Sequence, residues 1–350
     1  MRVIIKNYFI YALLILFAFS CGILSNKDKD KKTKQYLQYL LFGLVDNGEN
    51  TAKLFYISPL IKSGSSLDLD FVVEATSANV TLGKKKLVLV HGWDFNDRDS
   101  RGFTFSEQRG RIITDSWADF ISSSTFDGIV TTANYDVYAF DYLTSNSIEA
   151  NGRRFRTRMD ALFGSESGTV VIAAHSMGGL ISRFAVYEDT RPAYLNRIIT
   201  MGTPFHGSPW ASPEYQADKG TIGSIAGFMT DTTGGRDLAW DNFDGKISGA
   251  TNAKLTNINA KTDRDDFFYA YYGSVNSSGT RGAGGSVPGL YLACPVLGSN
   301  FAPSDCIVPS TSASLSGNTL TVRDIGAYDH LDLKLYISST QVTFYGDLPP

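Results

Sequence analysis

The sequence TVVIAAHSMGG, from Thr169 to Gly179, decides the fold of this chain. Its first six residues, Thr169–Ala174, are apolar apart from the threonine, which is typical of a strand buried on both faces of a parallel sheet. Ser176 follows between two small residues, Ala174 and Gly178. Larger side chains there would clash in a sharp strand-to-helix turn, so the pattern predicts that Ser176 is a nucleophile presented on such a turn. An ordinary tight turn is the alternative interpretation.

Apolar runs and helical patterns alternate on both sides of this stretch. The predicted strands are Leu87–Val90, Tyr135–Phe140, Thr169–Ala174, Arg197–Met201, Phe267–Tyr272 and Thr319–Val322, and the helical patterns span about Thr114–Ser123, Ser147–Leu162 and Gly179–Tyr187. Strands that alternate with helices predict the α/β class, with a mostly parallel central sheet and helices on both faces.

Two further segments flank this alternation. Upstream, the apolar stretch Tyr36–Val45 predicts a short helix, while Leu54–Ile61 and Phe71–Ala75 predict one or two edge strands. Downstream, residues 205–261 are rich in Gly, Ser, Thr and Asp and contain no clear strand pattern. Such a break in the alternation predicts a lid-like insertion over one end of the sheet.

Composition narrows the possible function classes. The 350 residues carry 32 basic and 35 acidic side chains, a net charge of −3, so there is no basic excess to neutralise phosphates. No nucleic-acid partner is therefore expected. Apolar residues make up 43% of the chain, enough for a large core. At ~150 residues per domain the length suggests two domains, but the order of the motifs predicts one catalytic domain over residues 51–350.

The first 50 residues predict export. Residues 1–20 have a basic start and then an apolar run, Tyr8–Phe19, that matches a signal peptide and is shorter than a membrane-spanning helix. Cys21 follows, and residues 21–50 begin as a polar tether. This arrangement resembles a bacterial lipoprotein signal, in which Cys21 would carry lipid and anchor the chain to a membrane. An ordinary cleaved signal of a secreted protein and an uncleaved anchor are the alternatives.

The other two cysteines, Cys294 and Cys306, lie twelve positions apart in a loop-rich segment. In an oxidising compartment they can form a disulfide. Two unrelated buried thiols are the alternative.

A serine nucleophile needs a base, and the four histidines are His91, His175, His206 and His330. Folds with this strand–turn–helix motif place the base last in the chain, after an acid, which selects His330. Several aspartates lie between the serine and this histidine: Asp231, Asp241, Asp244, Asp263, Asp265, Asp266, Asp305 and Asp324. Asp305 is the preferred acid, because its loop follows a predicted late strand, and Asp324 is the second choice.

An oxyanion hole requires two backbone N–H groups near the attacked carbonyl. The residue after the nucleophile, Met177, would supply one of them. The other is expected from the turn His91-Gly92-Trp93, where Trp93 would donate.

Together these motifs resemble the α/β-hydrolases close to the bacterial triacylglycerol lipases. The matching segments, in order, are Val90–Trp93, Ala174–Gly179, Gly202–Ser208, Asp305 with Val308-Pro309, and Asp329–Asp332. The resemblance implies a serine esterase that cleaves acylglycerol-type carboxylic esters through an acyl-enzyme, with Ser176, Asp305 and His330 as triad. It also implies a lid after Gly202-Thr203-Pro204. Trp93 departs from the family, which has leucine or methionine there, and His206 is assigned no role.

The resemblance leaves three questions open. No cofactor is required, but some relatives bind a structural calcium through the aspartate that corresponds to Asp332; Tyr336 stands where an amide is usual. The same triad would serve a phospholipase or an acyltransferase, and a non-catalytic surface lipoprotein that binds a lipid or a host partner is a further alternative. Whether the chain needs a dedicated folding partner is not determined by its sequence.

Overall fold

The computed structural model describes residues 52–350, except 64–65, 95–104, 281 and 283–289. The signal peptide, the polar tether with Cys21 and the predicted helix Tyr36–Val45 lie outside the described residues. Within the described residues, no helix is both long enough and apolar enough to cross a membrane.

An eight-stranded sheet organises the described residues, in the order β10-β9-β8-β7-β5-β6-β1-β4. The strands are β1 (Lys53–Ile57), β4 (Val72–Glu74), β5 (Lys85–Val90), β6 (Tyr135–Asp141), β7 (Val170–His175), β8 (Leu195–Met201), β9 (Phe268–Gly273) and β10 (Thr321–Gly326). Neighbouring strands from β10 to β6 are parallel, and only β1 and β4 join in antiparallel fashion. A separate pair, β2 (Lys62–Ser63) and β3 (Ser66–Leu67), forms a small hairpin. This mostly parallel sheet, with flanking helices, is the α/β-hydrolase fold, as the sequence predicted.

The upstream strands differ in one respect from the prediction. β4 is an edge strand, but β1 is not, because it pairs with β6 on one side and β4 on the other. The interior position of β1 explains why Leu54, Phe55 and Ile57 are all almost fully buried.

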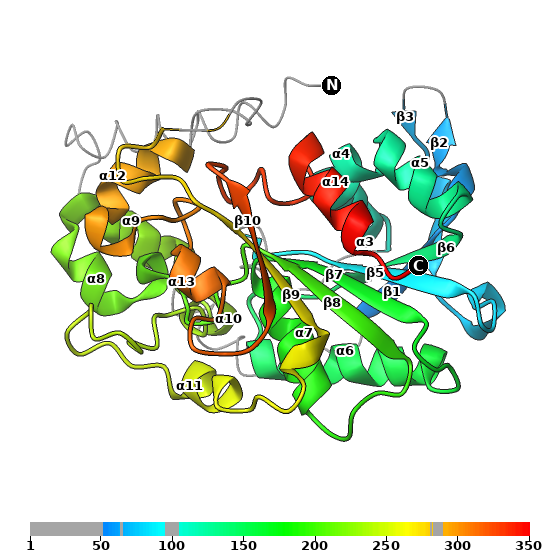
Figure 1. The fold of residues 1–350 in the computed structure, drawn as a ribbon, viewed down its shortest axis with the longest axis horizontal. Helices are drawn as coiled ribbons and strands as arrows, with labels where there is room; N and C mark the ends of the chain where they lie inside the picture. The colour runs from blue at the N-terminus through cyan, green and yellow to red at the C-terminus, as the bar shows by residue number, and fades with distance from the viewer. Residues whose placement is uncertain (1–51, 64–65, 95–104, 281, 283–289) are drawn as a thin grey trace, which may run out of the picture. The chain divides into compact units, whose positions relative to one another are not determined.

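Helices cover both faces of the sheet (Figure 1). They are α3 (Phe105–Gly110), α4 (Ala118–Ile121), α5 (Ser124–Thr131), α6 (Ile148–Phe163), α7 (Met177–Tyr187), α8 (Pro213–Asp218), α9 (Gly220–Thr230), α10 (Thr233–Arg236), α11 (Ala253–Asn259), α12 (Ala293–Leu297), α13 (Ser310–Ala313) and α14 (Ser338–Asp347). A π-helix, Arg111–Trp117, joins α3 to α4. The predicted helix Thr114–Ser123 therefore starts too late, because the buried polar residues Gln108 and Arg111 interrupt the apolar periodicity.

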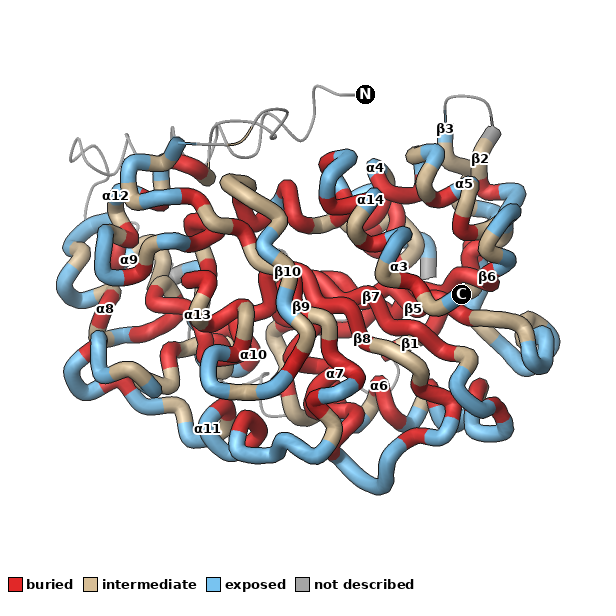
Figure 2. Tube along the Cα trace, viewed as in Figure 1, coloured by how far each residue is buried: buried red, intermediate tan, exposed pale blue. Residues whose placement is uncertain are grey.

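Successive residues of each central strand point to opposite faces, and each face has its own core. On β5, Val88 and Val90 pack with apolar side chains of α6 and α7. Leu87 and Leu89 pack instead with side chains of α4, α5 and α14. Figure 2 shows the central strands of the sheet as buried, whereas β10 at one edge is intermediate or exposed. Burial on both faces is the physical reason why these strands read as unbroken apolar runs.

The insertion at residues 205–261 contains helices α8 to α11 rather than strands. The sequence did not predict α9 because the helix contains glycines, which are unusual inside helices. They are needed for close packing: a Cβ at Gly223 would lie 1.7 Å from the carbonyl oxygen of Gln216. Tyr215 and Trp240 of the insertion pack against Phe301, between β9 and β10. At α10, a Cβ at Gly234 would lie 2.8 Å from Cε of Met177, so the insertion reaches the turn that carries Ser176.

Candidate active site

Ser176 occupies the turn between β7 and α7. Its backbone has φ 54° and ψ −127°, a left-handed φ that is strained for a residue with a side chain. The N–H of Ser176 donates to the carbonyl oxygen of Met201 on the adjacent strand at 2.9 Å. The neighbouring strand therefore helps to hold the conformation that presents the hydroxyl beyond the end of the sheet.

Two glycines in and beside this turn, Gly178 and Gly92, lie where a larger residue would collide with the chain. A Cβ at Gly178 would lie 2.5 Å from the carbonyl oxygen of His91 and 2.6 Å from that of Val90. A Cβ at Gly92 would lie 2.8 Å from Cβ of Ser176. The crowding at Gly178 and Gly92 thus comes from the contact between the end of β5 and the serine turn.

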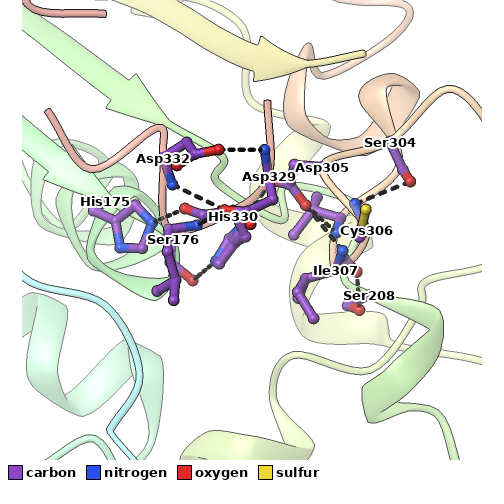
Figure 3. Close-up of polar contacts among 12 residues, drawn as sticks. His175, Ser176, Ser208, Ser304, Asp305, Cys306, Ile307, Asp329, His330 and Asp332 are labelled. Carbon is purple, nitrogen blue, oxygen red and sulfur yellow. Dashed lines mark hydrogen bonds and ion pairs between the residues drawn. The ribbon is translucent and has the colours of Figure 1, made fainter. Parts of the chain in front are cut away.

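The structure brings the three predicted triad residues into hydrogen-bond contact. Nε2 of His330 lies 2.8 Å from Oγ of Ser176, and Nδ1 of His330 lies 2.7 Å from Oδ2 of Asp305 (Figure 3). All three are buried, at 8% exposure for the serine, 7% for the histidine and 1% for the aspartate. When Nδ1–H donates to the carboxylate, Nε2 is free to accept the serine proton, which is the arrangement that activates a hydroxyl nucleophile.

Asp305 is fixed by its own loop. Its Oδ1 accepts the backbone N–H groups of Ile307 at 3.0 Å and Val308 at 2.6 Å, which leaves Oδ2 for the imidazole. The carbonyl oxygen of Asp305 also accepts the N–H of His330 at 3.0 Å. Acid and base are therefore joined by both side chain and main chain.

Three other candidates for the acid form hydrogen bonds or ion pairs with residues other than His330. Oδ1 of Asp324 accepts the N–H of Gly326, on its own strand. Asp265 forms a fully buried ion pair with Arg183 of α7 at 2.7 Å. Asp241 lies 2.8 Å from Nδ1 of His206. This last pair, with the imidazole stacked on Phe243, holds the start of the insertion and gives His206 a structural contact that its sequence position did not indicate.

The two predicted oxyanion donors lie on segments that contact the serine turn. Met177 is the first residue of α7, so its N–H has no intrahelical acceptor and points out of the helix N-terminus. Trp93 follows Gly92 in the turn after β5. That turn is anchored by Asp94, whose N–H donates to Oγ1 of Thr144 at 3.1 Å, and by the Tyr142 hydroxyl, which donates to the carbonyl oxygen of His91 at 2.6 Å.

One contact at the site was not foreseen from the sequence. Nε2 of His175 lies 2.8 Å from the carbonyl oxygen of His330. Burial, and secondarily the nearby His330, hold the pKa of His175 well below its usual value, so the imidazole is neutral and its Nε2–H donates. The residues are 155 positions apart, and no local pattern signals the contact.

Asp332, the possible calcium ligand, has a protein donor on its carboxylate. The Tyr291 hydroxyl donates to Oδ2 of Asp332 at 2.5 Å. The adjacent Asp329 is also buried, and burial, together with the Asp332 charge, raises its pKa to about 7. Over the described residues, no three His, Cys, Asp or Glu side chains are grouped to hold a metal ion. The carboxylates of Asp329 and Asp332 thus both already accept hydrogen bonds from protein N–H or O–H groups.

Cys294 and Cys306 form a disulfide beside Asp305. The bonded pair packs with Val275 and Tyr291 in a small buried cluster. The disulfide therefore links the segment that carries Tyr291 to the segment that carries the acid.

The chain shows limited similarity to known proteins. A family model described as a PGAP1-like alpha/beta domain matches residues 159–218, from the end of α6 through the serine turn into the insertion. No curated protein sequence matches the chain.

Several solved structures match the chain at low sequence identity. The lipase BlEst2 of Bacillus licheniformis in its propeptide form is 18% identical, with a TM-score of 0.48 over 75% of this chain and 49% of that one. Its mature form is 18% identical, with a TM-score of 0.45 over 76% and 95%. The phospholipase PlaB from Legionella pneumophila is 15% identical, with a TM-score of 0.40 over 66% and 45%. The chain spans about half the length of the propeptide form and of PlaB.

Proposed function

We propose that this chain is a serine hydrolase that cleaves carboxylic esters of the acylglycerol type through an acyl-enzyme. The observation that supports the proposal is the hydrogen-bonded row of Ser176, His330 and Asp305, with contacts of 2.8 and 2.7 Å at the end of a parallel sheet. The similarity to solved lipases and phospholipases does not identify a substrate. The choice of acylglycerol-type esters therefore rests on the resemblance of the sequence motifs to those of bacterial lipases.

The reaction follows from this row in two halves. Nε2 of His330 takes the hydroxyl proton of Ser176 as Oγ bonds to the ester carbonyl carbon, and the carbonyl oxygen becomes an oxyanion. The N–H groups of Met177 and Trp93 would stabilise that charge; loss of one such donor typically costs ~10²–10³ in rate. His330 then gives the proton to the departing alkoxide as the carbon–oxygen bond breaks. Water, deprotonated by the same imidazole, releases the acid and restores Ser176.

Hydrolysis of p-nitrophenyl esters across a series of acyl chain lengths tests this function and reveals the acyl preference. Ser176→Ala should lower kcat on the order of 10⁶-fold, because the nucleophile is removed. A fluorophosphonate probe should label the wild type and not Ser176→Ala. Full hydrolysis by Ser176→Ala would refute the assignment, and failure of the folded wild type to react with any probe would favour a non-catalytic lipoprotein.

Product analysis separates hydrolysis from the other reactions that the same residues could catalyse. With a diacylglycerol or a phospholipid as substrate and a short alcohol present, a hydrolase yields free fatty acid, whereas an acyltransferase yields a new ester. Release of acid from the phospholipid alone would identify a phospholipase.

We also propose that residues 205–261 act as a lid and that the chain is exported, either secreted or anchored to a membrane through lipid on Cys21. The lid is supported by the approach of α10 to Met177, and export by the sequence alone. Deletion of the insertion with unchanged kinetics on emulsions would refute the lid. Equal incorporation of labelled palmitate into the wild type and Cys21→Ser would refute lipidation.

A further inference from the structure

Tyr291 contacts the chain on both sides of His330. It lies in a short 3-10 turn, Leu290–Leu292, and its side chain is buried. The hydroxyl donates to Oδ2 of Asp332 at 2.5 Å, and it accepts the backbone N–H of Asp329 at 3.3 Å. One phenol therefore connects the residue before the histidine with the residue two positions after it.

We propose that Tyr291 is a positioning residue, whose hydroxyl braces the His330 loop at the place where the lipase resemblance expects a calcium ion. The inference rests on the proposed function for its kinetic consequences, but the brace itself is a structural claim about the His330 loop. The aspartate that corresponds to Asp332 binds a structural calcium in some relatives, and in this chain it accepts the hydroxyl of a neutral side chain.

The His330 loop needs such a donor because it buries two carboxylates together. Asp329 and Asp332 are both fully buried. Oδ1 of Asp329 accepts the N–H groups of Leu331 at 2.9 Å and Asp332 at 3.0 Å, which closes a tight turn around the histidine. A buried carboxylate is costly unless it is hydrogen-bonded or neutralised. The Tyr291 hydroxyl supplies Asp332 with a donor without adding a charge.

The turn that carries Tyr291 is itself attached to the acid. Tyr291 packs with Val275 and with the Cys294–Cys306 disulfide, and Cys306 directly follows Asp305. The Tyr291 hydroxyl therefore contacts the loop that carries His330, and the disulfide next to Tyr291 joins its segment to the loop that carries Asp305. A displacement of Tyr291 would alter the contact of 2.7 Å between Nδ1 of His330 and Oδ2 of Asp305.

The variant that tests the brace is Tyr291→Phe, which removes the hydroxyl and keeps the ring. A matched control is Tyr194→Phe, because Tyr194 is also buried and also donates to an aspartate, Oδ1 of Asp160, at 2.9 Å. Tyr194 directly precedes the first residue of β8, whereas Ser176 follows the last residue of the neighbouring parallel strand β7, so the two lie at opposite ends of the strands. Both variants remove the hydroxyl of a buried tyrosine that donates to an aspartate, and Asp160, unlike Asp332, is exposed. A difference in kcat between the variants therefore reports on where the lost hydrogen bond lies.

In the full chain, Tyr291→Phe should lower kcat for a p-nitrophenyl ester about 10-fold, since a misplacement of ~1 Å can cost up to ~10²-fold. KM should stay within about twofold, because the brace does not touch the substrate. Tyr194→Phe should keep the wild-type kcat. Chelation of divalent ions and the addition of calcium should both leave wild-type kcat unchanged. Unchanged kcat in Tyr291→Phe, or loss of wild-type kcat on chelation with recovery on calcium addition, would overturn the proposal.

A second readout does not depend on catalysis. The proton on Nδ1 of His330, shared with Asp305, should give a far-downfield resonance in the wild type that broadens in Tyr291→Phe and stays sharp in Tyr194→Phe. The same resonance in both variants would overturn the brace even if the protein hydrolyses no ester. An inactive wild type with the expected spectral change would instead refute the proposed function and leave the brace supported.

Discussion

Nε2 of His175 donates to the carbonyl oxygen of His330, across a distance of 2.8 Å. His175 is the residue before Ser176, so the segment that carries the serine also holds the main chain of the residue that contacts it. The rings of His175 and His330 lie 4.7 Å apart. The serine–histidine contact is therefore set by a backbone attachment as well as by the two side chains.

His175→Leu should lower kcat about 10-fold, because the apolar side chain fills much of the space but cannot donate to His330. His175→Gln should keep most of the activity, because the glutamine amide carries an N–H near the position of Nε2. Steady-state kinetics with a p-nitrophenyl ester measures both variants. Equal losses of kcat in the two variants would mean that the shape of the imidazole ring, rather than its hydrogen bond to His330, supports catalysis.

The same histidine should make the protein sensitive to acid. The pKa of His175 in the folded state lies well below its ordinary value of about 6.5, because burial disfavours the charged ring. As the pH falls through 6.5, the unfolded chain binds a proton at this position and the folded chain does not, so the free energy of unfolding decreases. Urea unfolding between pH 7 and pH 5 should therefore show a smaller loss of stability for His175→Gln than for the wild type. An identical slope in both proteins would contradict this expectation.

Asp305→Asn should lower kcat about 10⁴-fold, the loss seen when the acid of such a triad becomes an amide. In the native loop Oδ1 accepts two N–H groups and Oδ2 accepts the imidazole. An amide has one oxygen, so its NH₂ must face either the N–H groups of Ile307 and Val308 or the Nδ1–H of His330. Asp324→Asn is the matched control and should retain wild-type kinetics, since Asp324 bonds within its own strand. A larger loss in Asp324→Asn would reverse the assignment of the acid.

Gly202→Ala should disrupt the contact between acid and base. Gly202 has φ +59°, and a Cβ there would lie 2.8 Å from Oδ2 of Asp305 and 2.9 Å from Nδ1 of His330. The added methyl should therefore lower kcat about 10²-fold. Gly83→Ala separates this collision from backbone strain, because Gly83 has φ +72° and open space around it. Both variants should lose about 1–2 kcal/mol of stability from the left-handed backbone. Kinetics and urea unfolding of the two variants measure these losses, and wild-type kcat in Gly202→Ala would contradict the expectation.

The central strands and the serine turn could be predicted because their signals are local. The apolar run ending at Ala174 reflects burial on both faces, and the small residue at Gly178 reflects close approach of another chain segment. The segment involved was not predictable, since the end of β5 is brought to Gly178 only by parallel pairing with β7. The start of the helical region after β5 was misplaced, because Gln108 and Arg111 are polar residues that the tertiary structure buries.

By itself, the sequence determined the fold class and predicted the order of the proposed serine, acid and base, because periodicity and order are properties of a linear chain. The sequence selected His330 as the proposed base, and it left Asp324 as a second candidate for the acid beside Asp305. Only the tertiary structure decided which carboxylate meets the imidazole, and it added the contacts of His175 and Tyr291 to the His330 loop. Those contacts join residues far apart in the chain, at distances of 2.5 to 2.8 Å. Such distances depend on how strands and loops pack in space. This packing leaves no pattern among residues that are neighbours in the sequence.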